Sequence, residues 1–159
     1  MTARKTAYRM ILWLLTTACA VTILALSLQP AGQSSALSSG LTHRILSWFS
    51  AYRDLPIAEQ TVFLGQVQLL VREAAHVAEF AVLGLFASWL ASSYVGGKFW
   101  QLSLPSTALF AIVDECAQGL LAEGRAFQLI DLAKDWLGCA LGAAVVAVGI
   151  YVKQKTEKQ

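Results

Sequence analysis

The sequence predicts an all-α integral membrane protein: a bundle of four transmembrane helices with an interfacial amphipathic helix in the first extracytoplasmic loop. Of its 159 residues, 57% are hydrophobic and only 14% are charged, whereas a soluble domain carries about 25% charged residues. The mean hydropathy is +0.57. Four apolar runs, each near the ~20 residues that a helix needs to cross a bilayer, give the number of spans. We expect residues 1–159 to form one domain.

The first apolar run covers residues 10–28 and follows three basic residues. A signal peptide also begins with basic residues, but its apolar region is only ~7–15 residues long, so this run is interpreted as the first transmembrane helix. Pro30 lies just beyond its end. The Ser- and Gly-rich residues 31–40 are expected to form a loop.

Residues 41–53 carry an apolar stripe at helical spacing, formed by Leu41, Ile45, Trp48, Phe49 and Tyr52. Such a segment either lies in the membrane interface or packs as a short helix against the bundle. Asp54 is the candidate cap of a further short helix that starts near Pro56.

The remaining predicted spans cover residues 74–94, 99–121 and 131–152. Ionisable side chains inside apolar runs are costly in a membrane, so they are candidate site residues. Arg72, His76 and Glu79 share one face, because they lie within about 60° of one another at 100° per residue. Alternatively, His76 is a buried histidine with a structural role, and Glu79 only forms an ion pair with Arg72.

Six more polar candidates surround the last hydrophilic break: Asp114, Glu115, Gln118, Arg125, Asp131 and Asp135. The last two have a structural alternative, since carboxylates are favoured at helix N-termini. Gly138 and Gly142 continue their helical face, and this spacing predicts close approach to another helix. Glu73 and Glu123 are interpreted as solvated interface charges.

The distribution of basic residues predicts that both termini are cytoplasmic. The cytoplasmic set would be Arg4, Lys5, Arg9, Lys98, Lys153, Lys155 and Lys158. In this orientation three helices bring their polar residues to the outer leaflet, as a pocket open to the outer surface. No cluster of basic residues with interleaved aromatics points to nucleic acid.

These residues resemble the VanZ-like family over about residues 10–150. The resemblance rests on Arg72-x-x-x-His76, Phe80, Leu83-Gly84, Asp114-Glu115-x-x-Gln118, Arg125, Asp131, Gly138 and Gly142. Family members often carry Asn where this chain has Asp135. The resemblance implies a small, multi-pass protein of the bacterial cytoplasmic membrane, monomeric or oligomeric. The family name comes from a member associated with resistance to the glycopeptide teicoplanin.

Three functions are compatible with the sequence. The first is an enzyme, a phosphoesterase or transferase acting on a lipid head group or lipid-linked phosphate; fold-level analogy links the family to lipid head-group enzymes such as phosphatidylserine synthases. The second is a non-enzymatic envelope protein that binds a cell-wall precursor or masks antibiotic binding. The third is an ion-coupled transporter that uses the buried carboxylates and His76 as a relay.

For the enzyme, each candidate residue has an expected role. Arg72 and Arg125 would clamp phosphate, with Asp135 as a further substrate-binding residue. Acid, base or other catalytic roles fall to His76, Asp114, Glu115, Gln118 and Asp131. Alternatively Asp114, Glu115 and Asp131 would hold Mg²⁺ or Mn²⁺, which prefer carboxylate oxygens.

Overall fold

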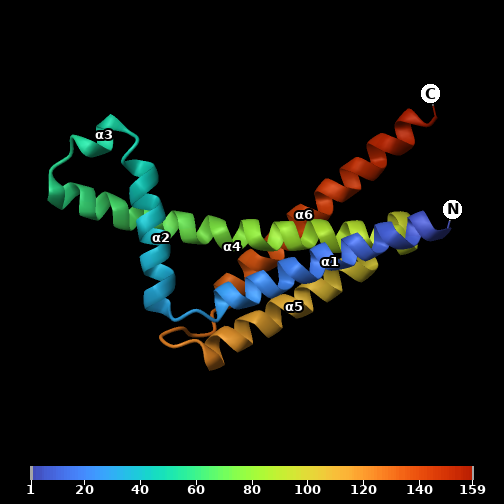
Figure 1. Cartoon of the computed structure of the whole chain (residues 1–159), viewed down its shortest axis with the longest axis horizontal. Coiled ribbons are helices and arrows are strands. Elements are labelled where there is room, and N and C mark those ends of the chain that lie inside the picture. Colours follow the sequence, from blue (N-terminus) through green and yellow to red (C-terminus); the bar gives the residue numbers. More distant parts are fainter. Residues whose placement is uncertain (1, 159) are drawn as a thin grey trace.

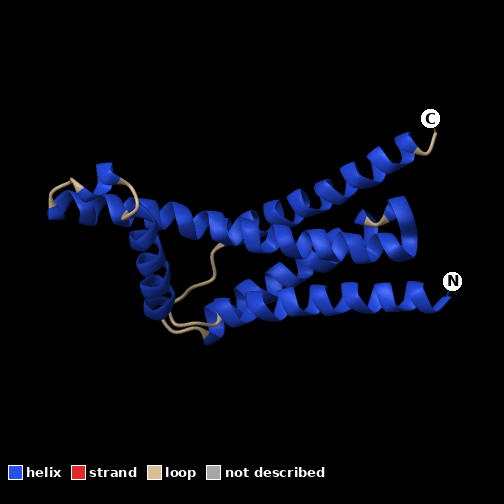
Figure 2. Cartoon of the chain, turned by 45° about the horizontal axis from the view of Figure 1, so that its top comes forward, coloured by secondary structure: helices blue, strands red, loops and turns tan. Residues whose placement is uncertain are grey.

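The computed structural model describes residues 2–158, and this part of the chain is helical without a strand. The elements are α1 (Thr2–Ser27), α2 (Ala31–Leu46), α3 (Ser50–Arg53), α4 (Ile57–Val95), the 3-10 turn η1 (Gly96–Lys98), α5 (Trp100–Leu121) and α6 (Leu129–Thr156). Helices α1, α4, α5 and α6 run along one another, while α2 crosses them (Figures 1 and 2). The N- and C-terminal ends of α1 and α6 lie at the same end of the molecule (Figure 1).

Three helices of the described chain are long and apolar enough to cross a membrane: α1, α4 with η1, and α6. Many of their large apolar side chains face outward, among them Leu14 at 68% exposure and Val148 at 61%. Outward apolar surface of this extent suits lipid rather than water. The chain is therefore a helical membrane protein.

Helix α5, with 22 residues, is long enough but not apolar enough to meet the same standard. Its last turns carry Asp114, Glu115 and Gln118, all buried against the other helices, and these residues lower its hydropathy. It nevertheless packs beside α4 and α6 (Figure 1). A fourth span at α5 stays a prediction.

Residues 31–40 belong to helix α2, so the expected loop was wrong. Pro30 is the N-cap of α2, with φ −52° and ψ 142°. The hydroxyl of Thr42 donates to the carbonyl of Ser38 at 2.7 Å, which satisfies it within the helix. Gln68 of α4 donates to the Ser35 carbonyl at 3.0 Å. Contacts with α4 thus stabilise a helix that its Ser- and Gly-rich composition does not favour.

The apolar stripe of residues 41–53 is not one helix, because the chain breaks at residues 47–49 between α2 and α3. Tyr52 is buried, and its ring lies 6.0 Å from the His43 ring and 6.1 Å from the Phe63 ring. Trp48, in contrast, is 75% exposed. Asp54 follows α3 as its C-cap, so the expectation that it caps the next helix was also wrong.

Helix α4 begins at Ile57, well before the predicted span of residues 74–94. Its 39 residues give a length of about 58 Å, nearly twice the ~30 Å hydrocarbon core of a bilayer. The N-terminal part of α4 extends beyond the other long helices, together with α2 and α3 (Figure 1). Of these elements, α2 crosses α4 next to the bundle (Figure 1).

Close contact between α4 and α6 depends on glycine. A Cβ on Gly138 would collide with the backbone carbonyl of Val77, and a Cβ on Gly142 would collide with that of Ala81. In the other direction, a Cβ on Gly84 would lie 2.5 Å from the carbonyl oxygen of Cys139. The predicted approach of this glycine face to another helix is confirmed, and its partner is α4.

Candidate functional site

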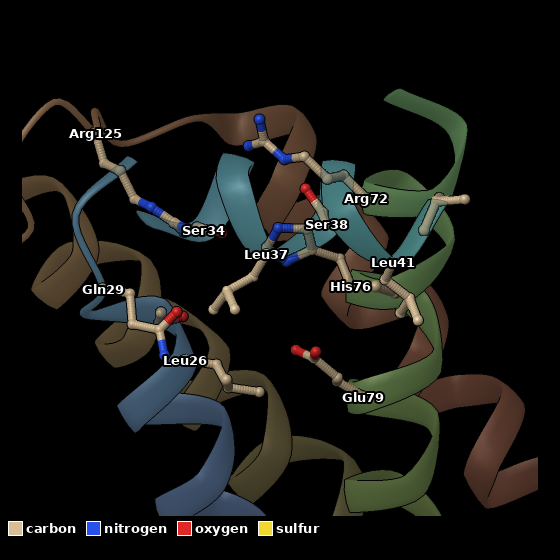
Figure 3. A pocket seen from close by; sticks show the side chains of 13 residues that line it. Leu26, Gln29, Ser34, Leu37, Ser38, Leu41, Arg72, His76, Glu79 and Arg125 are labelled. Carbon is tan, nitrogen blue, oxygen red and sulfur yellow. The ribbon is translucent and has the colours of Figure 1, made fainter. Parts of the chain in front are cut away.

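A pocket of about 300 Å³ lies at the end of the bundle that is remote from the termini, between α1, α2, α4 and the α5–α6 loop (Figure 3). Its polar lining includes Arg72, His76 and Glu79 on successive turns of α4, and Arg125 from the loop. The helical spacing predicted that the three α4 residues share a face, and the structure brings Arg125 to the same pocket.

Arg72 and Arg125 reach the pocket from different sides (Figure 3). None of the ion pairs among the described residues includes either guanidinium. The Nε atom of Arg125 is buried without a hydrogen-bond acceptor. Burial and the positive charge of Arg72 lower the pKa of Arg125, which nearby Asp114, Glu115 and Asp131 counteract. An arginine stays protonated under such shifts, so the pocket holds two positive charges without direct counter-ions.

Glu79 lines the pocket one turn below His76 (Figure 3). The alternative of a simple Arg72–Glu79 pair is not realised, because no ion pair joins these two side chains. The Glu79 side chain is half-buried and directed into the open space of the pocket.

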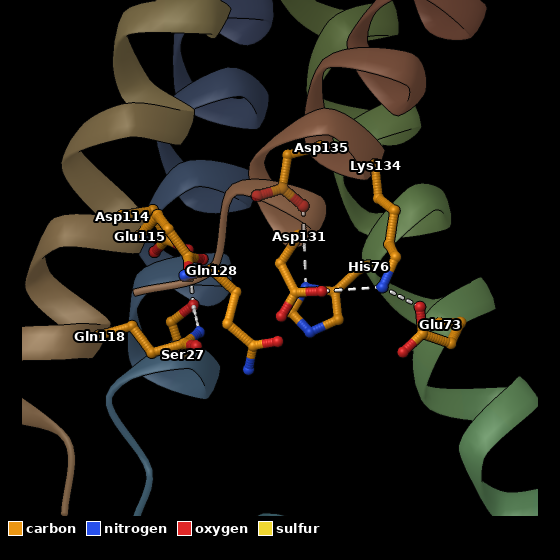
Figure 4. Close-up of polar contacts among 10 residues, drawn as sticks. All are labelled: Ser27, Glu73, His76, Asp114, Glu115, Gln118, Gln128, Asp131, Lys134 and Asp135. Carbon is orange, nitrogen blue, oxygen red and sulfur yellow. Dashed lines mark hydrogen bonds and ion pairs between the residues drawn. The ribbon is translucent and has the colours of Figure 1, made fainter. Parts of the chain in front are cut away.

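His76 stands between the pocket and Asp135 of α6. Its Nδ1 atom lies 3.7 Å from Oδ1 of Asp135, a residue with only 1% exposure (Figure 4). This Oδ1 atom is buried and accepts no hydrogen bond. Asp135 does not line the pocket itself. The structure therefore puts Asp135 behind the histidine, and its expected role in substrate binding stays a prediction.

Asp114 and Gln118 meet α1 beneath the pocket. The Ser27 hydroxyl donates to Oδ2 of Asp114 at 2.6 Å, and Nε2 of Gln118 lies 3.5 Å from the same hydroxyl oxygen (Figure 4). Neither Asp114 nor Gln118 lines the pocket, although Ser27 does. This buried group joins the end of α5 to the end of α1.

Glu115 anchors the loop that carries Arg125. Its Oε1 atom accepts a 2.6 Å hydrogen bond from the backbone N–H of Gln128, the N-cap residue of α6. On the other side of the loop, the Glu123 carbonyl accepts from the Ala31 N–H at 3.0 Å, which ties the loop to α2. Between these two anchors the chain turns at Gly124, whose φ of +74° disfavours other residues.

Asp131 takes part in a bridge between α4 and α6. Lys134 donates to Oδ1 of Asp131 at 2.8 Å and also pairs with Glu73 of α4 (Figure 4). Glu73 is exposed, as expected, and makes this ion pair in addition. Asp131 lies outside the pocket lining, so its evident contacts are structural.

Comparison with known proteins agrees with the resemblance seen in the sequence. The model of the VanZ/LLP1 family matches residues 12–150 of this chain. The chain belongs to the VanZ/LLP1 family. No curated protein and no solved structure matched it in the corresponding searches.

The expected metal ligands of this VanZ/LLP1 protein are engaged in other contacts. Within residues 2–158, no group of three His, Cys, Asp or Glu side chains is placed to hold a metal ion. The expected Mg²⁺ or Mn²⁺ ligands Asp114, Glu115 and Asp131 bind Ser27, the Gln128 amide and Lys134 instead. The side chains of the adjacent residues Asp114 and Glu115 also point in directions that differ by about 100° around the helix axis. The donor set does not fit a divalent cation.

The candidate residues of this VanZ/LLP1 protein thus form two groups, one in the pocket and one outside it. The pocket contains Arg72, His76 and Arg125, with Asp135 behind the histidine. The other candidates support the surrounding helices. Sequence reasoning missed Ser27, Gln128 and Lys134; of these, only Lys134 had a signal, its i,i+3 spacing from Asp131.

Proposed function

We propose that this protein binds the phosphate group of a membrane lipid in the pocket between Arg72 and Arg125. The observation that carries the proposal is that both guanidinium groups line one pocket, while none of the ion pairs within residues 2–158 includes either of them. Both arginines are half-buried, and partial burial of positive charge without a counter-ion is unfavourable, so an incoming anion would relieve this cost. Guanidinium groups match phosphate oxygens with paired hydrogen bonds.

The other half of the pocket is apolar, which favours a lipid over a free phosphate. Leu26 of α1 and Leu37 and Leu41 of α2 line it. The two α2 leucines are also more than half exposed, so the apolar wall continues onto the outer surface of the molecule. A lipid would lay its hydrocarbon along these leucines while the arginines bind its head group.

The pocket would face the outer leaflet of the bacterial cytoplasmic membrane, with both termini in the cytoplasm. The basic residues at the ends of α1 and α6 support this orientation. In this arrangement α5 forms a fourth span. Its polar residues face the protein, where they do not contact lipid.

A lipid-linked cell-wall precursor carries both a phosphate and a long hydrocarbon chain, and so has the chemistry that the pocket favours. Binding such a precursor is the route by which the protein would alter susceptibility to glycopeptides such as teicoplanin. This route requires no enzymatic step, and therefore also covers the alternative of a binding protein.

The proposal is tested by identifying the lipid that remains bound after gentle purification. Native mass spectrometry of the detergent-solubilised chain should detect a complex with a phosphate-bearing lipid, and the complex should be lost on joint replacement of Arg72 and Arg125 by Gln. Recovery of phosphate-free lipids alone, or equal lipid retention by the double variant, would contradict the proposal.

A further inference from the structure

We infer that the pocket hydrolyses a terminal phosphate ester of its lipid, with His76 as the general base and Asp135 as the residue that positions it. The inference rests on the proposed function, because the two arginines must first bind the phosphate. It adds an activity and assigns Asp135 a role that differs from substrate binding.

Two side chains in the pocket lining are suited to proton transfer. Of the residues that line it, His76 and Glu79 carry the groups that can give or take a proton, since the arginines stay charged. Asp114, Glu115 and Asp131 are outside the lining and hold Ser27, the Gln128 amide and Lys134. The carboxylates expected to act as acid or base are therefore committed elsewhere.

Asp135 is arranged to fix the orientation of His76. A proton on Nδ1 would point at the buried Oδ1 of Asp135, 3.7 Å away, and that oxygen accepts no other hydrogen bond. The remaining ring nitrogen, Nε2, is then unprotonated and available to accept a proton. The distance is long for a hydrogen bond, but catalytic hydrogen bonds often shorten only when substrate is bound. The same oxygen can still accept this hydrogen bond from the imidazolium that forms.

The reaction that these groups support is R–O–PO₃²⁻ + H₂O → R–OH + HPO₄²⁻. Water attacks phosphorus while Nε2 of His76 takes one of its protons, and the new P–O bond forms. The P–O bond to the lipid breaks, and the leaving oxygen takes a proton from the Glu79 carboxyl group. Transfer of the proton from His76 back to Glu79 restores both groups. Arg72 and Arg125 stabilise the charge on the phosphoryl oxygens throughout.

The test uses the full-length chain in mixed micelles that contain phosphatidic acid, a lipid with a phosphate monoester. Released inorganic phosphate gives kcat and KM, and a separate binding measurement gives Kd. We expect His76→Gln to lower kcat by about 10²- to 10⁴-fold with Kd unchanged. His43→Gln is the matched control, since His43 is the other histidine of the chain and lies on α2 outside the pocket.

The Asp135→Asn variant tests whether Asp135 positions His76 for catalysis or only contributes to the stability of the fold. We expect it to lower kcat at least tenfold. KM and Kd should stay within twofold of the wild-type values, and the unfolding temperature should stay within a few degrees. Glycerol 3-phosphate, which has the head group without the chains, should be a poor substrate. Equal turnover of the two compounds would identify a free-phosphate site instead and overturn the lipid assignment.

Two failures are distinguishable. If the wild type does not bind phosphatidic acid, the proposed function itself is wrong for phosphate monoesters. If it binds in an Arg125-dependent way yet releases no phosphate, or if His76→Gln retains full turnover, the inferred hydrolysis is wrong and the pocket only binds.

Discussion

Gly142 is the position where the packing of α4 on α6 is most sensitive to a small change. A Cβ there would collide with the carbonyl of Ala81 and the amide of Leu85, and these are backbone atoms that cannot rotate away. Overpacking of this kind costs about 1–3 kcal/mol. Alanine also gains about 1 kcal/mol over glycine in helix propensity. Gly142→Ala should therefore be destabilised by up to about 2 kcal/mol.

Gly149→Ala is the matched control on the same helix. A Cβ at Gly149 would meet no atom within 4 Å, so this variant should keep the propensity gain without the collision. The two variants should differ by about 1–3 kcal/mol, the collision cost alone. Reversible unfolding in mixed detergent micelles measures both free energies. Equal stability of the two variants would refute the close α4–α6 contact.

Three further outcomes are expected. Glu115→Gln weakens the hydrogen bond to the Gln128 amide, loosening the Arg125 loop and lowering lipid affinity severalfold in a direct binding assay. Lys134→Met leaves the buried Asp131 without its partner, and should lower the unfolding free energy by about 1–3 kcal/mol. For topology, a single cysteine at Glu123, with the native cysteines replaced, should react with an impermeant thiol reagent on intact cells. One at Lys155 should react only after lysis, and the reverse pattern would invert the orientation.

The helices were largely predictable because hydropathy and the polar interruptions are local properties of the sequence. The 100° spacing placed Arg72, His76 and Glu79 on one face, and the structure directs all three into one pocket. Helix α2 was not predictable, since its Ser- and Gly-rich composition favours a loop and its stabilising partner, Gln68, lies far along the chain.

The partners of the buried carboxylates were also beyond sequence reasoning. Glu115 binds a backbone amide, and a backbone group leaves no mark in the sequence. Asp114 binds Ser27, a common residue at the end of an apolar run. Residue type alone suggested catalysis or metal binding for both, and it gave no sign of the contacts by which Glu115 holds the Arg125 loop and Asp114 holds α1.

The central claim, phosphate binding between Arg72 and Arg125, is tested most directly by the affinity for phosphatidic acid of the chain in nanodiscs. Arg125→Lys keeps the charge and removes the guanidinium fork; Arg44→Lys, at an exposed position on α2, is the control. Loss of a charge-assisted hydrogen bond is worth about 1.5–3 kcal/mol, or about tenfold to a hundredfold in Kd. We predict this loss for Arg125→Lys at unchanged stability, and none for Arg44→Lys. Equal Kd values for the wild type and both variants would contradict the claim.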